Sequence, residues 1–189
     1  MRSAVRLLGT VLSTVLLAAM GLEAGAQYTD SPTISREDAI KAAYLCNFTR
    51  YVTWPEGTFS GEGQPFVIGL FGQNAIIPYL RKAASKIKAP ERQMVVREFE
   101  KPEQYVPCQI LFIGASATES DRKEILRRVG KSSTLVVGET PRFAGDGGII
   151  CFYVDNNRVR FEINPGAAKQ RGLKISSKLL ALAKVVPVE

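Results

Sequence analysis

One residue type is missing from the sequence: none of its 189 residues is histidine. Serine–histidine and cysteine–histidine catalysis, and every metal site that uses imidazole, are therefore excluded. The acidic residues show no calcium-loop spacing, and the cysteines lack the short paired spacing of a zinc site. These absences exclude many classes of enzyme and predict that the protein needs no metal and no cofactor.

Cysteine is scarce, with single residues at positions 46, 108 and 151. An odd count allows at most one disulfide within the chain, and the spacing does not choose among the three pairings. Cys46 falls on a predicted helix, whereas Cys108 and Cys151 fall at predicted strands, so we expect a Cys108–Cys151 disulfide. Three buried free thiols are an equally consistent arrangement, because unpaired cysteine is commonly a core residue.

The N-terminus has the three parts of a secretory signal peptide. It carries a positively charged start, an apolar run of 14 residues over 7–20, and small residues over 24–26. A retained membrane span would need about 20 apolar residues. We therefore expect residues 1–26 to be removed and residues 27–189 to form a soluble, exported protein.

The charge balance is basic, with 25 Lys and Arg against 18 Asp and Glu and a formal net charge of +7. Removal of the signal peptide leaves 23 basic and 17 acidic residues, a net charge of +6. No basic stretch is interleaved with aromatic residues, so nucleic acid is not expected as a partner. The charge fits an anionic membrane surface, an acidic envelope polymer, an acidic protein or simply a solvated surface.

Helix-like and strand-like segments alternate through most of the chain. A helix is expected to begin after the N-cap Ser35 and to end at Trp54–Pro55. Further strands are expected over residues 65–71, 92–98, 109–113 and 134–137, with helices over 75–86 and 118–129. This alternation predicts an α/β protein, in which helices cover both faces of a mostly parallel sheet to give three layers, α/β/α.

The pattern changes near the C-terminus. Two strand-like runs, 149–155 and 158–163, meet at Asn156–Asn157, which suits the tight turn of an antiparallel hairpin. A short helix over 164–170 and a final amphipathic helix over 175–185 are expected to follow. No long linker divides the sequence, so residues 27–189 are expected to form a single domain.

Two runs in this C-terminal region resemble the signature of the YfiR family. They are Val159-Arg160-Phe161-Glu162-Ile163-Asn164 and Gly172-Leu173-Lys174-Ile175-Ser176-Ser177-Lys178-Leu179-Leu180. Earlier segments agree in the same order, namely Lys41 to Leu45 with Asn47-Phe48 and Trp54-Pro55, Pro65 to Gly69, and Cys108 to Gly114. The likeness spans nearly all of residues 27–189.

The resemblance implies a non-enzymatic periplasmic regulator. Such a protein binds the periplasmic domain of an inner-membrane diguanylate cyclase, represses it and so lowers cyclic di-GMP signalling and affects biofilm regulation. A YfiB-like outer-membrane lipoprotein would sequester the repressor, and the family is associated with homodimers and disulfides. Partner contacts are expected in the signature region, at Phe152, Arg160, Glu162, Lys174, Ile175 and Leu179. The opposing interpretation gives several residues of that region a purely structural role in the core.

Two other classes of function stay open. A small-ligand or sensor module acting on another envelope signalling protein would bind its ligand where parallel strands end, near Gly72–Asn74 and Gly114–Ser116. An envelope enzyme that uses carboxylates and water is the third class, although no carboxylate pair stands out.

Overall fold

The computed structural model describes residues 35–186 except residues 60, 62, 73 and 88–91. The predicted signal peptide over residues 1–26 lies outside the described residues. Residues 34–189 form one compact unit. Within the described part of the chain, no helix combines the length and the apolar character that a bilayer crossing requires.

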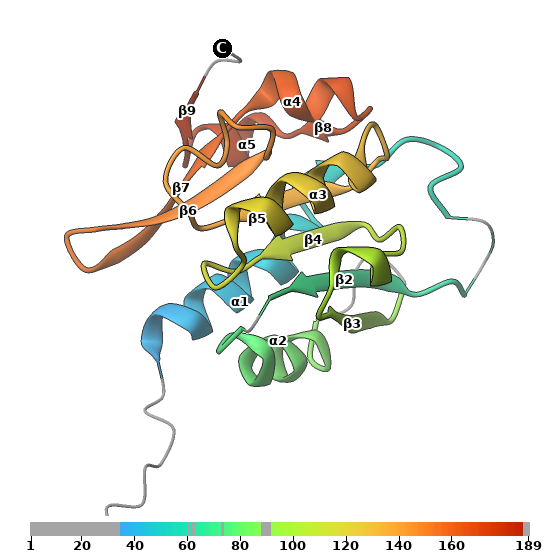
Figure 1. Cartoon of the computed structure of the whole chain (residues 1–189), viewed down its shortest axis with the longest axis horizontal. Helices are drawn as coiled ribbons and strands as arrows, with labels where there is room; N and C mark the ends of the chain where they lie inside the picture. Colours follow the sequence, from blue (N-terminus) through green and yellow to red (C-terminus); the bar gives the residue numbers. More distant parts are fainter. Residues whose placement is uncertain (1–34, 60, 62, 73, 88–91, 187–189) are drawn as a thin grey trace, which may run out of the picture. The chain divides into compact units, whose positions relative to one another are not determined.

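A seven-stranded sheet forms the middle layer (Figure 1). Its strands in spatial order are β3 (Met94–Phe99), β2 (Phe66–Phe71), β4 (Ile110–Ile113), β5 (Leu135–Gly138), β6 (Ile150–Asp155), β7 (Arg158–Ile163) and β9 (Lys184–Val185). Neighbouring strands are parallel except β6 and β7, which pair antiparallel. The predicted α/β class, with a mostly parallel sheet and a C-terminal antiparallel hairpin, is confirmed.

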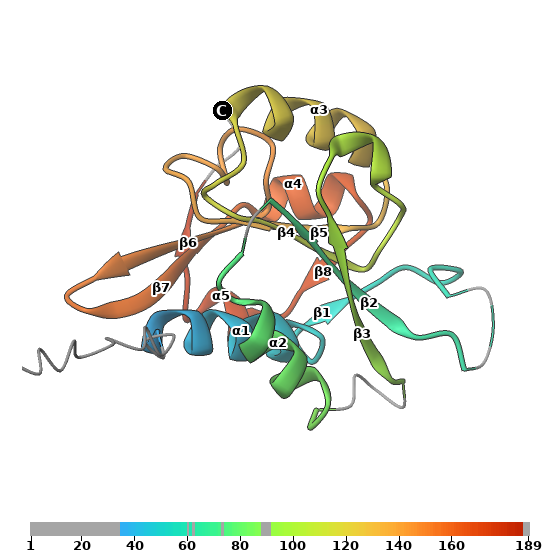
Figure 2. The same cartoon turned by 60° about the horizontal axis from the view of Figure 1, so that its bottom comes forward.

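Helices cover both faces of the sheet (Figure 2). Helices α1 (Arg36–Phe48) and α2 (Ile77–Ala84) lie on one face, and α3 (Glu119–Val129) lies on the other. As predicted, Ser35 caps α1, because its hydroxyl accepts a hydrogen bond of 3.2 Å from the Asp38 amide. Such a cap contributes about 1 kcal/mol to stability. Shorter helical elements include the 3₁₀ turn η1 (Pro102–Gln104) and α4 (Pro165–Gln170).

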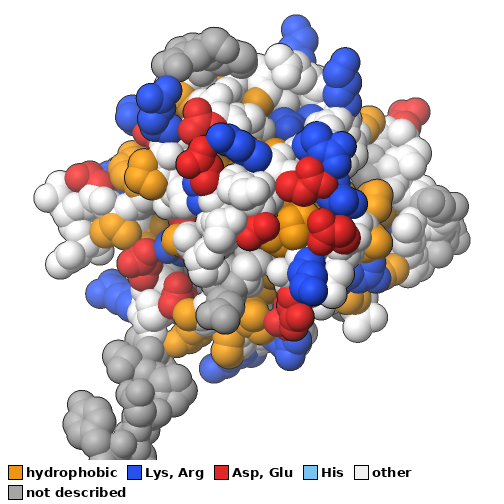
Figure 3. Space-filling view, viewed as in Figure 1, with side chains coloured by type: hydrophobic (Ala, Val, Ile, Leu, Met, Phe, Trp, Pro, Cys, Tyr) orange, Lys and Arg blue, Asp and Glu red, His pale blue; other side chains and the backbone are white. Residues whose placement is uncertain are grey.

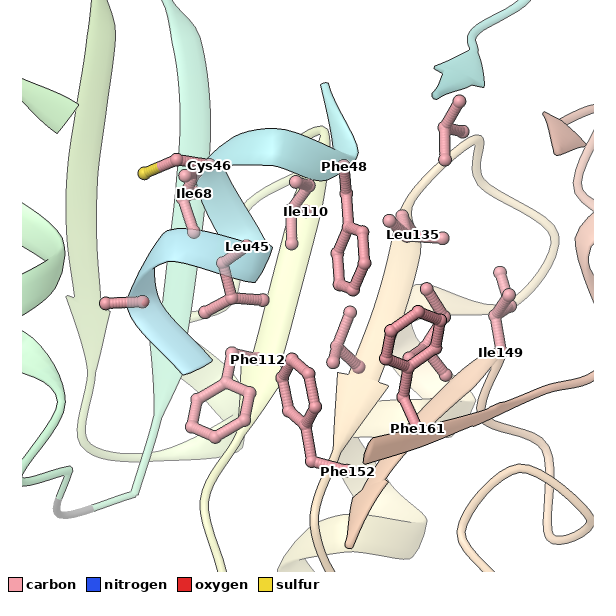
Figure 4. Packing of buried hydrophobic residues seen from close by; sticks show 14 of the residues in the cluster. Leu45, Cys46, Phe48, Ile68, Ile110, Phe112, Leu135, Ile149, Phe152 and Phe161 are labelled. Atoms are coloured by element: carbon pink, nitrogen blue, oxygen red, sulfur yellow. The ribbon is translucent and has the colours of Figure 1, made fainter. Parts of the chain in front are cut away.

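The larger of two apolar cores lies between the sheet and α1. Phe48 of α1 packs against Phe152 of β6 and Phe161 of β7, with ring centroids 6.0 and 5.7 Å apart (Figure 4). Phe112 of β4 extends this aromatic group, 6.3 Å from Phe152. Burial of one such ring is worth roughly 1.5–3 kcal/mol before packing terms, so these rings fix the hairpin to α1.

The β6–β7 turn has the backbone that its sequence predicts. Asn156 and Asn157 both adopt positive φ, 49° and 58°. Asparagine tolerates this left-handed region better than most residues, and two such residues in succession match the twist of a two-residue hairpin.

The first helix ends earlier than the sequence predicts, at Phe48 rather than at Trp54. The backbone forms a tight turn there, because the amides of Arg50 and Tyr51 donate hydrogen bonds to the carbonyls of the residues three positions earlier in the chain. Val52–Thr53 then forms β1, which pairs antiparallel with β8 (Lys174–Ile175) in a separate two-stranded sheet. β-Branched residues favour this extended conformation over another helical turn.

The prediction of a final helix over residues 175–185 is wrong. Helix α5 (Ser177–Leu180) has only four residues, and Ser176 caps it by accepting a hydrogen bond from the Leu179 amide. The chain then turns through residues 181–183 into β9, which pairs with β7. The apolar spacing of the leucines resembled a long helix, but pairing of the following residues with the open edge of β7 overrode it.

Candidate functional site

The β6–β7 hairpin extends past the neighbouring strands of the sheet (Figure 1). Its register places Tyr153 opposite Arg160 and Phe152 opposite Phe161. Because side chains alternate along a strand, one face of the hairpin carries apolar residues towards α1 and the other carries polar residues. We define the hairpin surface as the exposed and partly exposed residues of this hairpin together with residues 182–185.

The polar face of the hairpin surface carries paired charges. Arg160 lies 3.1 Å from Asp155, and Lys184 of β9 lies 2.7 Å from Glu162. The hydrogen bond from Lys184 to Glu162 raises the pKa of Lys184. Arg158 has no ion pair with any described residue. Solvent-exposed pairs contribute about 0–1 kcal/mol, so these charges can exchange partners at little cost.

Three large hydrophobic side chains are exposed on or beside the hairpin. Val154 of β6 is 50% exposed, Val185 of β9 is 54% exposed, and Leu182 in the turn before β9 is 70% exposed. The registers put Val154 opposite Val159 and Val185 opposite Ile163, so both valines lie on the α1 side of the sheet. Exposed apolar residues rimmed by polar ones are typical of a protein-binding surface.

Two predicted contact residues are part of the core. Phe152 is 1% exposed and Leu179 is 3% exposed. The Phe152 ring lies within 6.4 Å, centroid to centroid, of the rings of Tyr44, Phe48 and Phe161. Neither side chain reaches a partner while the fold is intact, so both support the surface from below.

The other predicted contact residues lie in two places. Arg160 and Glu162 belong to the hairpin surface, whereas Lys174 and Ile175 lie on β8, paired with β1. Lys174 is exposed and Ile175 packs partly against the core. Leu182 ends the segment from Ser176 to Leu182, which the family resemblance also marks as a candidate contact region. Sequence reasoning missed Val154 and Val185 because their apolar character suggested burial.

The predicted Cys108–Cys151 disulfide is not formed, and all three cysteines are buried free thiols. Strand register explains this. Cys151 of β6 pairs with Gly138 of β5, and Gly138 pairs with Ile113 of β4, which lies five residues after Cys108. The two cysteines are thus two strands apart and about 16 Å apart along the strands. A disulfide needs Cα atoms within about 7 Å. Burial raises the pKa of Cys108 to about 12 and that of Cys151 to about 11, so both thiols are unreactive at neutral pH.

The loops predicted to hold a small ligand pack against each other instead. A Cβ on Gly114 would lie 2.3 Å from Oδ1 of Asn74, and one on Gly72 would lie 2.9 Å from Oγ of Ser116. The Asn74 amide also donates to the carbonyl of Phe71 at 3.1 Å. The glycines therefore allow close loop contact where the ligand was expected.

A buried ion pair lies beside these loops. Lys41 of α1 donates to Glu139 at 2.5 Å and pairs with Glu37 at 2.5 Å, and Glu139 also accepts from the Ala115 amide at 2.9 Å. Burial alone would lower the pKa of Lys41, but the hydrogen bonds to Glu139 and Glu37 raise it. The group ties α1 to the ends of β4 and β5. We assign it a structural role.

A hollow of about 600 Å³ lies beside β1 and the start of β2. Trp54, Phe66, Arg50 and Arg92 are among its lining residues. The Trp54 indole donates to the Gln109 carbonyl at 3.2 Å, which fixes the ring at the start of β4. Among the described residues, no group of three metal-ligating side chains comes together.

On the face that carries α3, basic and acidic residues are interspersed (Figure 3). Lys123 pairs with Glu119 at 2.5 Å, and Arg127 and Arg128 both pair with Glu124 at 2.7 Å. Two arginines on one carboxylate lower the pKa of Glu124 to about 2. Basic and acidic residues thus pair with one another on this solvent-facing helix.

Comparison with known proteins agrees with this geometry. A crystal structure of a conserved domain protein from Vibrio cholerae O1 biovar El Tor str. N16961 has the same fold, with a TM-score of 0.53 and 14% sequence identity. The alignment covers 78% of this chain and 59% of that one, so the chain spans about three fifths of the length of that protein. No curated protein matches the chain. The sequence model of the YfiR/HmsC-like family matches residues 38–184, and the chain therefore belongs to this family of periplasmic regulators of cyclic di-GMP signalling.

Proposed function

We propose that the protein represses an inner-membrane diguanylate cyclase by binding the cyclase's periplasmic domain through the hairpin surface. The observation that carries this proposal is the set of exposed hydrophobic residues, Val154, Leu182 and Val185, on a member of a cyclic di-GMP regulatory family. Arg160 and Glu162 lie on the opposite face of the same hairpin, where they supply orientation through charge. Phe152 and Leu179 hold the surface in place from the core.

Repression through this surface requires binding only, with no chemical reaction catalysed by the protein. The protein keeps the cyclase inactive if it binds the inactive arrangement of the periplasmic domain more tightly than the active one. A hundredfold preference corresponds to about 2.7 kcal/mol, which a few buried hydrophobic side chains can supply. Competition for the same surface by a YfiB-like outer-membrane lipoprotein would release the cyclase.

The proposal includes export. Residues 1–26 act as a cleaved signal peptide, and residues 27–189 work in the periplasm as a regulatory domain without enzymatic activity. Lys174 and Ile175 on β8 contribute to a homodimer or to a second partner contact, outside the hairpin surface.

A deletion strain tests the function. Cyclic di-GMP is measured in cells that lack the gene and in cells that regain it either intact or without residues 1–26. We expect the level to rise on deletion and to fall again only with the exported form. An unchanged level on deletion, with the cyclase expressed, contradicts the proposal.

A second candidate function is a small-ligand sensor, favoured by the hollow beside Trp54. Its size lies within the usual range for ligand sites, about 300–1,000 Å³, and its lining mixes aromatic and cationic side chains. Differential scanning fluorimetry with periplasmic metabolite fractions tests it, because a bound ligand raises the melting temperature. Trp54→Ala should remove any such rise, whereas a rise that survives this substitution places the ligand elsewhere.

A further inference from the structure

A polar hollow lies beside the starts of β4 and β5. Its volume is about 430 Å³, and residues 55–58, 107–109 and 132–134 line it together with Gln64. Residues 55–57 also line the hollow beside Trp54, so the two hollows are neighbours. We call the polar one the Gln109 hollow. Its size falls within the usual range for small-ligand sites, about 300–1,000 Å³.

Gln109 offers this hollow a hydrogen-bond donor without a protein partner. The residue is only 7% exposed, and its Oε1 accepts a hydrogen bond of 2.7 Å from the Val67 amide. A backbone amide only donates, so this contact identifies the carboxamide oxygen, and Nε2 has no hydrogen bond with any described residue. Among the described residues, Nε of Arg171 is the only fully buried side-chain nitrogen or oxygen without a partner, so Nε2 of Gln109 is open to the hollow. An accessible donor on so buried a residue points to a ligand that accepts from it.

Two serines add acceptors to the same hollow. The Thr134 hydroxyl donates to the Cys108 carbonyl at 2.7 Å, so it accepts in its 3.1 Å contact with the Ser132 hydroxyl. Ser132 therefore donates its proton to Thr134 and keeps lone pairs free to accept. The half-buried Ser133 hydroxyl has no hydrogen bond with any described residue, so it can donate or accept. The hollow thus presents donors and acceptors together.

The charges around the Gln109 hollow argue against ionic ligands. Glu56 is the only charged residue among the described residues that line it. No lining lysine or arginine is present there to hold a phosphate or a carboxylate, and Glu56 would repel either anion. An alkylammonium ion has no acceptor for Nε2 of Gln109. A neutral molecule that carries several oxygens, some as hydroxyls, matches all of these groups.

We propose that the Gln109 hollow binds a neutral sugar unit, either free or at the end of a glycan. A carbonyl or ring oxygen of the sugar accepts from Gln109, and its hydroxyls donate to Ser132 and Glu56. The C–H groups of the sugar pack on Pro55 and Pro107, which also line the hollow. The site lies outside the hairpin surface, so the proposal does not depend on the cyclase interaction.

The probe is N-acetylglucosamine, because its acetamide carbonyl suits the Gln109 donor and its hydroxyls suit the acceptors. The sugar is titrated into the whole mature protein, and NMR follows the side-chain amide of Gln109 and the backbone amide of residue 133. We expect a saturable shift of both signals. The linked trimer of the same sugar separates the two sources, because tighter binding than the monomer indicates a glycan and equal binding indicates a free sugar.

Two matched glutamine variants locate the contact. Gln109→Glu keeps an oxygen for the Val67 amide and replaces the N–H donors of Nε2 with a second oxygen. Gln104→Glu makes the same change on an exposed glutamine outside the hollow, whose Oε1 accepts from the amides of Glu100 and Lys101 at 2.8 and 3.1 Å. We expect Gln109→Glu to weaken sugar binding about tenfold and Gln104→Glu to leave it unchanged. Circular dichroism melts establish that both variants fold.

A serine variant tests the site without changing a buried charge or donor. Ser133→Ala removes a hydroxyl that has no hydrogen bond with any described residue, and it should weaken sugar binding about threefold. The proposal is overturned if N-acetylglucosamine shifts neither signal, if Ser133→Ala or a folded Gln109→Glu protein binds it normally, or if putrescine or inorganic phosphate binds more tightly than the sugar. These results are independent of the cyclic di-GMP measurements, so either proposal can fail alone.

Discussion

The two edges of the sheet are built differently. At one edge, the chain's own C-terminal residues form β9 and cover part of β7, while exposed hydrophobic side chains remain around it. At the other edge, no described strand pairs with the outer side of β3, and the preceding helix α2 contains Arg81 and Lys82 and no acidic residue. The comparison teaches that the two edges of one sheet can expose different groups. The hairpin exposes hydrophobic side chains, whereas β3 exposes backbone groups on its outer side.

The largest expected effect is on the free energy of unfolding, through the aromatic packing beneath the hairpin. Phe152→Ala should lower the free energy of unfolding by about 3–5 kcal/mol, because the ring is buried among other aromatics. Val96→Ala, in the partly buried part of β3, should cost only about 1 kcal/mol. Urea unfolding measures both. Equal losses would show that the hairpin is not anchored more firmly than β3.

Alkaline pH should lower the stability of the fold through its three buried thiols. The pKa of Cys46 and of Cys151 is raised by burial to about 11 and that of Cys108 to about 12, so each stays protonated when folded. The unfolded chain ionises from about pH 9, binds fewer protons than the folded chain, and is therefore favoured as pH rises. The free energy of unfolding should fall above pH 9, by at most about 1.4 kcal/mol per thiol and pH unit.

The raised pKa of Lys41 acts in the same direction, but at higher pH. Its stabilisation is complete below its unfolded pKa, near 10.5, and is lost as pH rises through the folded value. Urea unfolding at pH 7, 9 and 11 gives the profile, and a variant with alanine at all three cysteines should decline less steeply. A profile unchanged by this variant would contradict the thiol assignment.

Removal of β9 tests whether the edge strand β7 depends on its pairing with β9 for stability and for a monomeric state. A chain that ends at Ala183 loses the two-residue pairing with β7 and the hydrogen bond from Val186 to Ile163. We expect a loss of about 2 kcal/mol in unfolding free energy and increased self-association by light scattering. If the truncated chain is as stable and as monomeric as the full one, β9 does not protect this edge.

The smallest expected effect on stability concerns the charges of the hairpin surface. Glu162→Gln breaks the exposed pair with Lys184 and should change the free energy of unfolding by less than about 1 kcal/mol. The same substitution should weaken repression measurably, because orientation of the partner depends on the charge. A large loss of stability with no loss of repression would reverse this assignment.

Much of the fold could be predicted from residues that act locally. Strand–helix alternation gave the layers and the parallel centre, Ser35 gave the start of α1, and Asn156–Asn157 gave the hairpin turn. The errors came where distant pairing decides the conformation. Val52–Thr53 and Lys184–Val185 became short strands because β8 and β7 lie beside them, and no local pattern contains that information.

The candidate site was predictable only in part, for a similar reason. Arg160 and Glu162 alternate with apolar residues, so their exposure follows from the sequence. Phe152 and Val154 have the same parity on β6, yet one is buried and the other exposed. Phe152 packs against Tyr44 and Phe48 of α1, and strand parity alone does not predict this tertiary contact.

One measurement tests the central claim most directly. Val154→Glu places a charge on the hairpin surface, and Val106→Glu places the same charge on another exposed valine outside it. Each full-length variant is returned to the deletion strain, and cyclic di-GMP and co-purification of the cyclase are measured together. The account predicts that Val154→Glu loses both the complex and repression, while Val106→Glu keeps both. Normal repression by a folded, exported Val154→Glu protein would contradict it.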